Sequence, residues 1–380
     1  MPPDIICARE FFMAYYIGLM SGTSIDGIDC VLADFSENRK PEYLAGVALD
    51  WSPEDRRMFG SLTSPGNDEI HRAGIAGCRY AEKAAEAIHT LLEKNGLAPD
   101  DIVAVASHGQ TIRHEPENGF TVQIGNHALL AALSGIDVVA DFRSADIALG
   151  GQGAPLVPAF HQEILSSENS NRFIINIGGI SNVTALIPGR KTSGYDLGPG
   201  NTLSDLLAEK LFNIPCDRDG ILASEGTVNE NALRCFLQNP YFSARPPKST
   251  GRELFNEGFL LKFPGFETLS PRDQMATVCE LTARSIAEGL DFLEAKGDIY
   301  ICGGGCHNSY LMKRISALAR THGHGRVATV QELGIDPDFL EGFAFAWLGY
   351  CFMKRIPVNM TCITGSRRPV IMGCLYPHSR

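Results

Sequence analysis

GLMSGTSIDGIDCVLADF, residues 18–35, is an apolar run that enters a turn of small residues and leaves as a second, alternating run. The first run begins at Tyr15, the turn is SGTS at residues 21–24, and residues 28–35 alternate apolar and polar side chains. This pattern predicts a β-hairpin. Backbone N–H groups at a tip of glycine and hydroxyl residues can bind phosphate. These residues alone leave a phosphate loop and an ordinary turn both open.

The composition is that of a globular protein with an excess of acidic residues. The chain has 380 residues, of which 44% are hydrophobic and 20% charged, with a formal net charge of −11. This length predicts two domains or one large domain. The negative charge argues against a nucleic-acid or anionic-membrane surface. An anionic ligand would therefore be held by local donors.

The cysteines and the N-terminus indicate the compartment. Eleven cysteines occur without a C-x-x-C pair or zinc spacing, which predicts reduced thiols in the cytoplasm. No run approaches the roughly 18 apolar residues that a membrane span needs. Residues 1–12 lack the basic start of a signal peptide, and we expect them to be a dispensable extension before Met13.

A second stretch repeats the first pattern later in the chain. FIINIGGISNVTALI, residues 173–187, is again an apolar strand, a glycine turn and another strand. The repetition predicts two related domains. We place them at residues 1–150 and 151–354, with residues 355–380 packing back on the first.

Strands and helices alternate between and after the two hairpins. Residues 74–94 and 273–294 have helical periodicity, and 102–111, 135–143 and 298–302 are expected to be strands. The last strand runs into three glycines and then a helix over 308–319. Such strands commonly carry functional groups at their carboxyl ends. The fold class is therefore α/β.

Three glycine turns need one explanation: Gly22-Thr23, Gly178-Gly179 and the triple glycine. Neither G-x-x-x-x-G-K-[ST] nor G-x-G-x-x-G occurs. Two such hairpins followed by strand–GGG–helix resemble the actin, hexokinase and Hsp70 ATPase architecture. That resemblance implies two RNase H-like domains around a nucleotide cleft, with Mg²⁺ and ATP as cofactors. The aspartate that usually opens the first hairpin is Met20 here, so Asp26 or Asp29 is expected to replace it.

Ten motifs then match one family in order: GLMSGTSIDGID, SHGQTIRHEP, FTVQIGN, DVVADFRSADIALGGQGAPLVPAFH, INIGGISNV, YDLGPGN, CDRDG, PPKSTGRELFN, CGGGCHN and EGFAFAWL. From about Tyr16 to Pro377 the chain is similar to the 1,6-anhydro-N-acetylmuramate kinases. Cys306 and Ser366 depart from it, since alanine is expected at both. The resemblance implies an ATP-dependent enzyme of cell-wall recycling that opens the anhydro bridge, yields the 6-phosphate and forms a homodimer.

The resemblance also assigns roles to three charged residues. Asp196 aligns with the general base, although an aspartate before a glycine turn is by itself most often a turn former. Arg143 would contact the lactyl carboxylate of muramic acid, which suits its planar fork. Glu341, at the start of an apolar helix, would bind sugar hydroxyls. The alternative is that it only stabilises the helix through a favourable interaction with the helix dipole.

The remaining candidates form two sets. The nucleotide-binding residues expected are Gly22, Thr23, Ser24, Ile25, Asp26, Gly27, Ile28, Asp29, Gly178, Gly179, Gly303, Gly304 and Gly305. Besides Arg143 and Glu341, the substrate-binding residues expected are Gln110, Gly198, Gly200 and Asn201. The metal ligands are not determined, with Asp26 as the candidate.

Five further polar residues have an ordinary structural explanation. We expect His161 to be structural and leave His108 as a loop residue. Lys248, Ser249 and Thr250 form either a phosphate loop or an exposed basic loop, and we expect the latter.

Two other functions remain open on the sequence. One is a nucleotide-dependent conformational switch like actin or Hsp70, and the other is a hexose kinase of the same fold. A switch has no need of a sugar-facing Asp196 and Arg143. A hexose kinase needs a base for a sugar hydroxyl, not for water.

Overall fold

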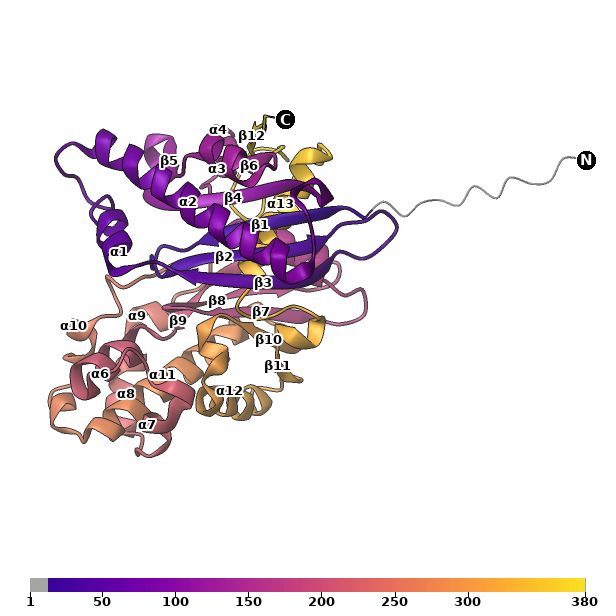
Figure 1. Cartoon of the computed structure of the whole chain (residues 1–380). Helices are drawn as coiled ribbons and strands as arrows, with labels where there is room; N and C mark the ends of the chain where they lie inside the picture. The colour runs from indigo at the N-terminus through magenta and orange to yellow at the C-terminus, as the bar shows by residue number, and fades with distance from the viewer. Residues whose placement is uncertain (1–12, 380) are drawn as a thin grey trace, which may run out of the picture. The chain divides into compact units, whose positions relative to one another are not determined.

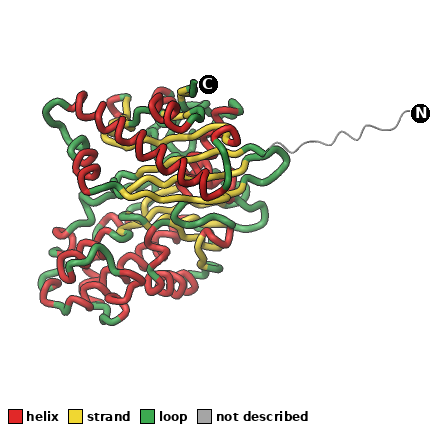
Figure 2. The backbone as a smooth tube through the Cα atoms, viewed as in Figure 1, coloured by secondary structure: helices red, strands yellow, loops and turns green. Residues whose placement is uncertain are grey.

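Two β-sheets, one in each of two units of the chain, organise the computed structural model, which describes residues 13–379. One unit comprises Met1–Phe160 and Glu341–Arg380, and the other His161–Leu340. Helices accompany the strands of each sheet (Figure 1 and Figure 2). These divisions differ from the expected ones at 150/151 and 354/355, and the expectation for residues 1–12 lies outside the described residues.

The first unit contains a seven-stranded sheet. Its path is β12-β6-β4-β1-β2-β3, and β5 pairs with β4. Strands β1, β2 and β3 are antiparallel neighbours, whereas β4 runs parallel to β1 and β6 parallel to β4. The elements are β1 (Tyr15–Ser21), β2 (Gly27–Asp34), β3 (Glu42–Asp50), α1 (Pro53–Gly60), α2 (Glu69–Asn95), β4 (Ile102–Glu115), β5 (Phe120–Ile124), α3 (His127–Ser134), β6 (Val138–Ala140), α4 (Ser144–Ala148), α5 (Val157–Phe160), α13 (Leu340–Met353) and β12 (Cys374–Tyr376).

The second unit contains a five-stranded sheet of order β11-β10-β7-β8-β9. Strands β7, β8 and β9 are antiparallel neighbours, and β10 and β11 continue the sheet in parallel with β7. The elements are β7 (Arg172–Ile177), β8 (Ile180–Leu186), β9 (Ser193–Pro199), α6 (Thr202–Phe212), α7 (Ile221–Ser224), α8 (Glu230–Leu237), α9 (Pro240–Ser243), α10 (Glu257–Leu260), α11 (Pro271–Gly289), β10 (Asp298–Cys302), α12 (Ser309–Thr321) and β11 (Val327–Thr329).

The two sheets share one topology. In each, three antiparallel strands are followed by two parallel ones beside the first, giving β3-β2-β1-β4-β6 and β9-β8-β7-β10-β11. This is the strand order of RNase H-like, actin-like ATPase domains. The predicted α/β fold with two related domains is therefore confirmed.

Successive residues of β1 contact two different helices, because side chains alternate across a strand. Ile17 and Leu19 belong to the buried cluster that includes Ala84 and Ile88 of α2. On the other face, the ring of Tyr16 packs edge-on against Tyr350 of α13. The apolar helix α13 thus covers this sheet, which is the physical reason that it joins the first unit.

Gly18 is the point at which α13 comes closest to β1. A Cβ built on Gly18 would lie 1.9 Å from the carbonyl oxygen of Gly342 and 2.5 Å from the nitrogen of Ala346. We expect Gly18→Ala to destabilise the protein by about 3 kcal/mol or more, because backbone must move. The control is Gly74→Ala, which faces open space in helix α2 and is expected to stabilise by about 0.5–1 kcal/mol. Urea unfolding measures both, and equal stabilities would contradict the close approach.

Strand β6 is shorter than the strand expected over 135–143. It ends at Ala140 because Asp141 has a left-handed backbone, with φ of 58°. Helix α4 begins after Arg143, which places that arginine at the helix start. By contrast, α2, α11, α12 and β10 correspond to predicted elements to within a few residues at most ends.

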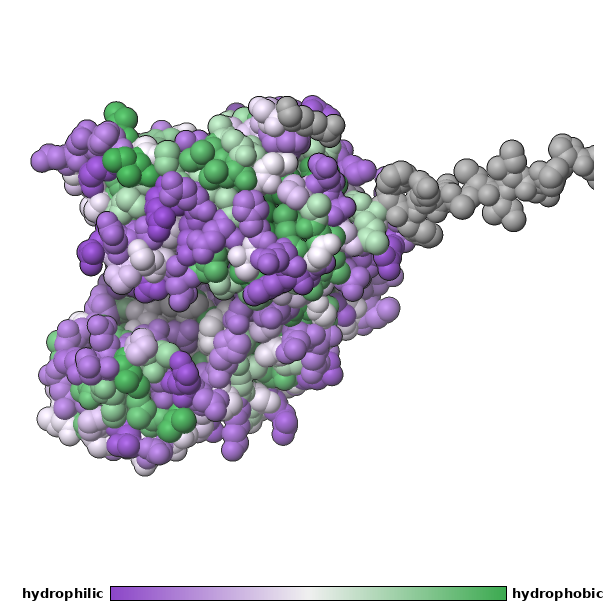
Figure 3. All heavy atoms as spheres, viewed as in Figure 1, coloured by the Kyte–Doolittle hydropathy of each residue, from purple (hydrophilic) through white to green (hydrophobic). Residues whose placement is uncertain are grey.

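The surface agrees with the ordinary composition. On the face shown in Figure 3, hydrophilic residues surround small groups of hydrophobic ones. Among residues 13–379, no helix is long and apolar enough to cross a membrane. The cysteines of residues 13–379 are not paired in disulfides.

Candidate active site

The tip of the first hairpin is a tight turn with free backbone donors. Its one turn hydrogen bond runs from the Ile25 N–H to the Gly22 carbonyl (3.2 Å), and Ile25 has φ of 54°. A left-handed backbone is unusual for a β-branched residue and commonly marks a functional site. Thr23 and Ser24 are exposed, and their N–H groups donate to no other described residue. Such N–H groups suit an oxyanion.

Gln110 supports this hairpin from β4. Its Nε2 donates to the Gly22 carbonyl (2.9 Å), and its Oε1 accepts from Ser21 Oγ (2.7 Å). Trp51 Nε1 in turn donates to Ser21 Oγ (3.3 Å). The amide is fully buried and engaged at both ends, which favours a role in positioning the hairpin. Its contact with a sugar stays a prediction.

Arg143 is held by His108. The guanidinium donates to His108 Nε2 from Nε (3.1 Å) and Nη2 (2.9 Å), while Nη1 donates to the Gly153 carbonyl (2.7 Å). Because Nε2 accepts, the histidine proton is on Nδ1, which faces the Ser21 carbonyl at 3.1 Å. Burial, reinforced by the arginine charge, lowers the pKa of His108 to about 3. His108 is therefore neutral and links the hairpin to Arg143, which the sequence missed.

Glu341 and Asp26 share an electrostatic environment with Arg143. Burial raises the pKa of Glu341, Arg143 opposes that rise and Asp26 adds to it. Burial also lowers the pKa of Arg143 to about 10, so it remains charged at neutral pH. Three predicted residues thus lie near one another in the first unit.

Asp26 is the candidate metal ligand of the first hairpin. Among residues 13–379 no group of three or more His, Cys, Asp or Glu side chains could hold a metal. Asp26 is exposed, and its Oδ1 accepts from the adjacent Gly27 N–H (3.0 Å). Mg²⁺ typically takes one or two carboxylates together with phosphates and waters. Asp26 therefore fits a metal that arrives with a nucleotide.

In the second unit, the tip of the second hairpin is fixed by the loop between β9 and α6. The N–H groups of Gly200 and Asn201 donate to the carbonyls of Gly179 (2.9 Å) and Gly178 (2.8 Å). Thr202 Oγ1 donates to the Gly179 carbonyl as well (2.7 Å). The N–H groups of Gly178 and Gly179 donate to no other described residue, so they remain available.

The triple glycine reaches the same place. A Cβ on Gly303 would lie 2.2 Å from Asn176 Oδ1, and one on Gly305 would lie 2.2 Å from Ile177 Cγ2. Both neighbours are at the end of β7, just before the hairpin tip. The structure thus brings together three stretches of the second unit that the sequence singled out: 178–179, 200–201 and 303–305.

Gly22, Gly178 and Gly304 differ from these packed glycines. The atom nearest to a built Cβ would be 3.4 Å away at Gly22, 3.8 Å away at Gly178 and 3.8 Å away at Gly304. None has a left-handed φ. The fold itself thus tolerates a side chain at each, which favours a ligand as the reason for glycine.

Asp196 lies within strand β9, so the alternative explanation as a turn former does not hold. Its Oδ2 accepts from the Thr250 N–H (2.9 Å), and no described residue donates to its Oδ1. Burial raises its pKa and Glu253 adds to this, whereas the Thr250 hydrogen bond lowers it. One oxygen is thus fixed, while the other can accept a proton.

The segment PPKSTGRE is more than an exposed basic loop. The Lys248 carbonyl accepts from the Asp196 N–H (3.2 Å), so the segment runs beside β9. The Lys248 ammonium lies 4.6 Å from the ring centre of Tyr241 and 5.0 Å from that of Phe292, and Nζ donates to the Tyr241 carbonyl (3.2 Å). Lys248 is half-buried and structural, and Ser249 is exposed.

Sequence reasoning missed two supporting residues besides His108. Tyr241 donates from its hydroxyl to the Asp196 carbonyl (2.7 Å). Asp146, fully buried, accepts from the Gly153 N–H (2.8 Å) and so fixes the loop that binds Arg143. The Tyr241 contact joins residues 45 apart in sequence, which no local pattern reveals, whereas Asp146 and Gly153 are only seven residues apart.

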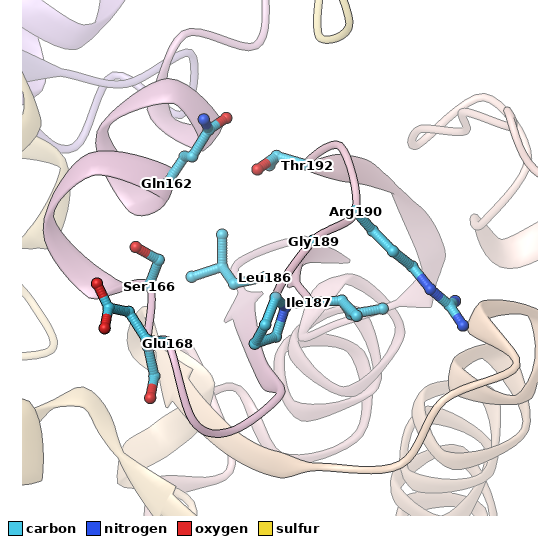
Figure 4. Close-up of a pocket in the computed structure, with 10 residues that line it drawn as sticks. Gln162, Ser166, Glu168, Leu186, Ile187, Gly189, Arg190 and Thr192 are labelled. Carbon is cyan, nitrogen blue, oxygen red and sulfur yellow. The ribbon is translucent and has the colours of Figure 1, made fainter.

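A cavity of about 370 Å³ lies at the far end of the second hairpin. Its lining includes Leu186 and Ile187, whereas the glycine tip precedes the first residue of β8. A strand of seven residues separates its ends by about 20 Å. In Figure 4, Gln162 and Thr192 border the cavity and Arg190 points away from Glu168. The cavity is therefore separate from the glycine turns.

Comparison with known proteins identifies the family of the chain. The family model described as anhydro-N-acetylmuramic acid kinase matches residues 14–378. The chain belongs to the anhydro-N-acetylmuramic acid kinase family. It is 45% identical over 368 residues to the kinase of that name from Shewanella pealeana, covering 96% of this chain and 98% of that one. It is 46% identical over 367 residues to the one from Pseudomonas paraeruginosa, covering 96% and 99%.

Solved structures outside the anhydro-N-acetylmuramic acid kinase family are more distant. The activator of the 2-hydroxyisocaproyl-CoA dehydratase from Clostridium difficile, with bound ADPNP, has a TM-score of 0.46 and 12% identity, covering 90% of this chain and 96% of that one. A ROK family glucokinase from Streptomyces griseus, in complex with glucose and AMPPNP, has a TM-score of 0.38 and 15% identity, covering 88% and 99%.

Proposed function

We propose that the protein is an ATP-dependent kinase that hydrolyses the 1,6-anhydro ring of 1,6-anhydro-N-acetylmuramic acid and phosphorylates O6. The products are N-acetylmuramate 6-phosphate and ADP, within peptidoglycan recycling. Family membership supports this function. The observation that carries the mechanism is Asp196, with one carboxylate oxygen held by Thr250 and the other free to accept a proton.

Asp196 is the proposed general base for water. Water is a poor nucleophile at neutral pH, so a carboxylate must take its proton as it attacks C1. The C1–O6 bond then breaks and O6 keeps the electron pair. O6 bonds to the γ-phosphorus, and ADP leaves with the electron pair of the broken P–O bond. The transfer neutralises the charge on O6 without a separate general acid.

The glycine turns are the proposed phosphate contacts. Free N–H groups of Thr23 and Ser24 at the first tip, and of Gly178 and Gly179 at the second, can donate to phosphate oxygens. Gly303–Gly305 would approach the adenosine, as the resemblance implies. Bound Mg²⁺ would offset the phosphate charge, and Asp26 is the residue that would hold it.

Arg143 and Glu341 are the proposed sugar contacts. The charged guanidinium, oriented by His108, would bind the lactyl carboxylate, and Glu341 would accept from sugar hydroxyls. The remaining proposed contacts are Gly198, Gly200, Asn201 and Gln110. The proposal includes a cytoplasmic homodimer, which rests on the resemblance and which analytical ultracentrifugation can test.

A phosphotransfer assay tests the function. The protein with Mg²⁺ and ATP is given anhydro-N-acetylmuramate, and in parallel N-acetylmuramate, N-acetylglucosamine or glucose. We expect one ADP per 6-phosphate with the anhydro sugar and at least a hundredfold lower kcat/KM with the others. Comparable turnover of glucose would indicate a hexose kinase, and ATP hydrolysis without a sugar product would indicate a nucleotide switch.

A further inference from the structure

Arg252 lies beside the tip of the second hairpin. A Cβ built on Gly179 would be 3.8 Å from Arg252 Nη2 and 3.9 Å from Nε, so the guanidinium borders that glycine. The side chain is exposed. Arg252 is on the same short segment as Thr250, whose N–H donates to Asp196. One segment thus reaches both the proposed base and the proposed phosphate turn.

The charge of Arg252 has no direct partner in the described part of the chain. Its side chain donates no hydrogen bond to residues 13–379 and forms no ion pair with them within 4.0 Å. Asp205, in the first turn of α6, feels the charge at longer range. Burial raises the pKa of Asp205 to about 6, and Arg252 opposes that rise. The guanidinium donors remain free to bind a ligand.

Lys248, the other cation at this end of the segment, is already engaged. Its ammonium donates to the carbonyls of Tyr241 and Phe242 and contacts two aromatic rings. The chain as a whole carries a formal charge of −11, which repels an anion. A phosphate at Gly178-Gly179 therefore depends on nearby local donors, and Arg252 is placed to be one.

We propose that Arg252 donates hydrogen bonds to a phosphoryl oxygen bound at the Gly178-Gly179 tip and stabilises the charge that develops during transfer. This inference rests on the proposed kinase function. The planar guanidinium matches phosphate oxygens, and the backbone hydrogen bonds that fix the hairpin and the segment keep Arg252 near the proposed phosphate turn. The Thr250 contact keeps Asp196 in register with Arg252, so the base and the phosphate contact are positioned together.

The test compares Arg252→Ala and Arg252→Lys with Arg245→Ala, an exposed arginine of the same loop. We expect Arg252→Ala to lower kcat by about 10²–10³-fold, as loss of one charge-stabilising donor does. Arg252→Lys should recover only part, since an ammonium lacks the fork. Added guanidinium should partly restore Arg252→Ala, whereas Arg245→Ala should match the original protein. An unchanged kcat in Arg252→Ala overturns the proposal. So does a lower kcat that added guanidinium does not restore, if Arg252→Lys is fully active.

A sugar-free measurement separates this inference from the proposed function. Tripolyphosphate with Mg²⁺ is titrated calorimetrically into the original protein and Arg252→Ala, after their melting curves have been compared. Weaker binding to Arg252→Ala supports the phosphate contact even if no anhydro sugar is phosphorylated. Equal binding by two equally folded proteins contradicts the contact, even if the kinase activity is confirmed.

Discussion

Asp196→Asn is expected to lower kcat by at least about 10²–10⁴-fold, the range typical of a lost general base. The loss should be larger if ring opening and phosphoryl transfer fail together. The amide keeps an oxygen that can accept from the Thr250 N–H and from bound sugar, so the KM for sugar should change little. Steady-state kinetics measure this split between kcat and KM.

An isotope experiment follows the atoms. In a single turnover in ¹⁸O-water, stopped before the anomeric hydroxyl exchanges with solvent, label should appear at C1 and not in the transferred phosphate. The sugar's own O6 then carries the phosphorus. Label in inorganic phosphate with the anhydro sugar unchanged would mean a simple ATPase and would contradict the kinase mechanism.

The pKa of Asp196 predicts the acid side of the pH profile. A base acts when deprotonated, and burial raises this pKa, so kcat should fall with decreasing pH above the range of an ordinary aspartate. Glu253 contributes to the rise, so Glu253→Gln should move the acid limb to lower pH while keeping the base. An unmoved limb would mean that another group limits the rate.

The raised pKa of Asp196 also predicts that ionisation of this carboxyl lowers the stability of the fold. A carboxyl whose folded pKa is raised contributes stability below its unfolded pKa, and this contribution is lost as pH rises through the folded value. Above that folded pKa the charged Asp196 is thus a cost to the fold. Asp196→Asn should therefore melt no lower than the original protein at alkaline pH, although its kcat is reduced.

The fold was predictable because its signals are local. Each hairpin is written in one continuous stretch, as an apolar strand, a glycine turn and a second strand, and both appear as β1–β2 and β7–β8. The apolar helix that begins near Glu341 was also predictable from the local sequence. Its place in the first unit was not, because that depends on Gly18 and Gly342 allowing a close approach across the whole length of the chain.

In the candidate site, too, the local stretches were predictable from the sequence and the contacts between distant residues were not. The three glycine stretches of the second unit were predicted, and they do come together. The contacts that orient the charged groups were not predicted, since His108 to Arg143 and Thr250 to Asp196 join residues far apart in sequence. Arg252 belongs to the motif PPKSTGRELFN, but the sequence does not show what it contacts. Only its position beside Gly179 in the structure distinguishes it from an ordinary surface arginine.

Gly22→Val is expected to abolish activity, with a loss of at least about 10³-fold, while leaving the fold intact. The branched side chain would occupy the place at which phosphate approaches the free N–H groups of Thr23 and Ser24. Within the protein, a Cβ at Gly22 meets only the atoms of Ser24, the nearest at 3.4 Å. Phosphotransfer kinetics and nucleotide titration measure the loss.

Gly60→Val is the matched control, because Gly60 ends helix α1 and a Cβ there meets no atom within 4 Å. Both variants should melt close to the original protein, since neither adds a clash, but only Gly22→Val should lose nucleotide binding. If Gly22→Val turned over ATP normally with sugar present, the first hairpin would not be a phosphate loop. If it unfolded, Gly22→Ala would replace it, since a single methyl group still intrudes on the phosphate while needing less room from the turn.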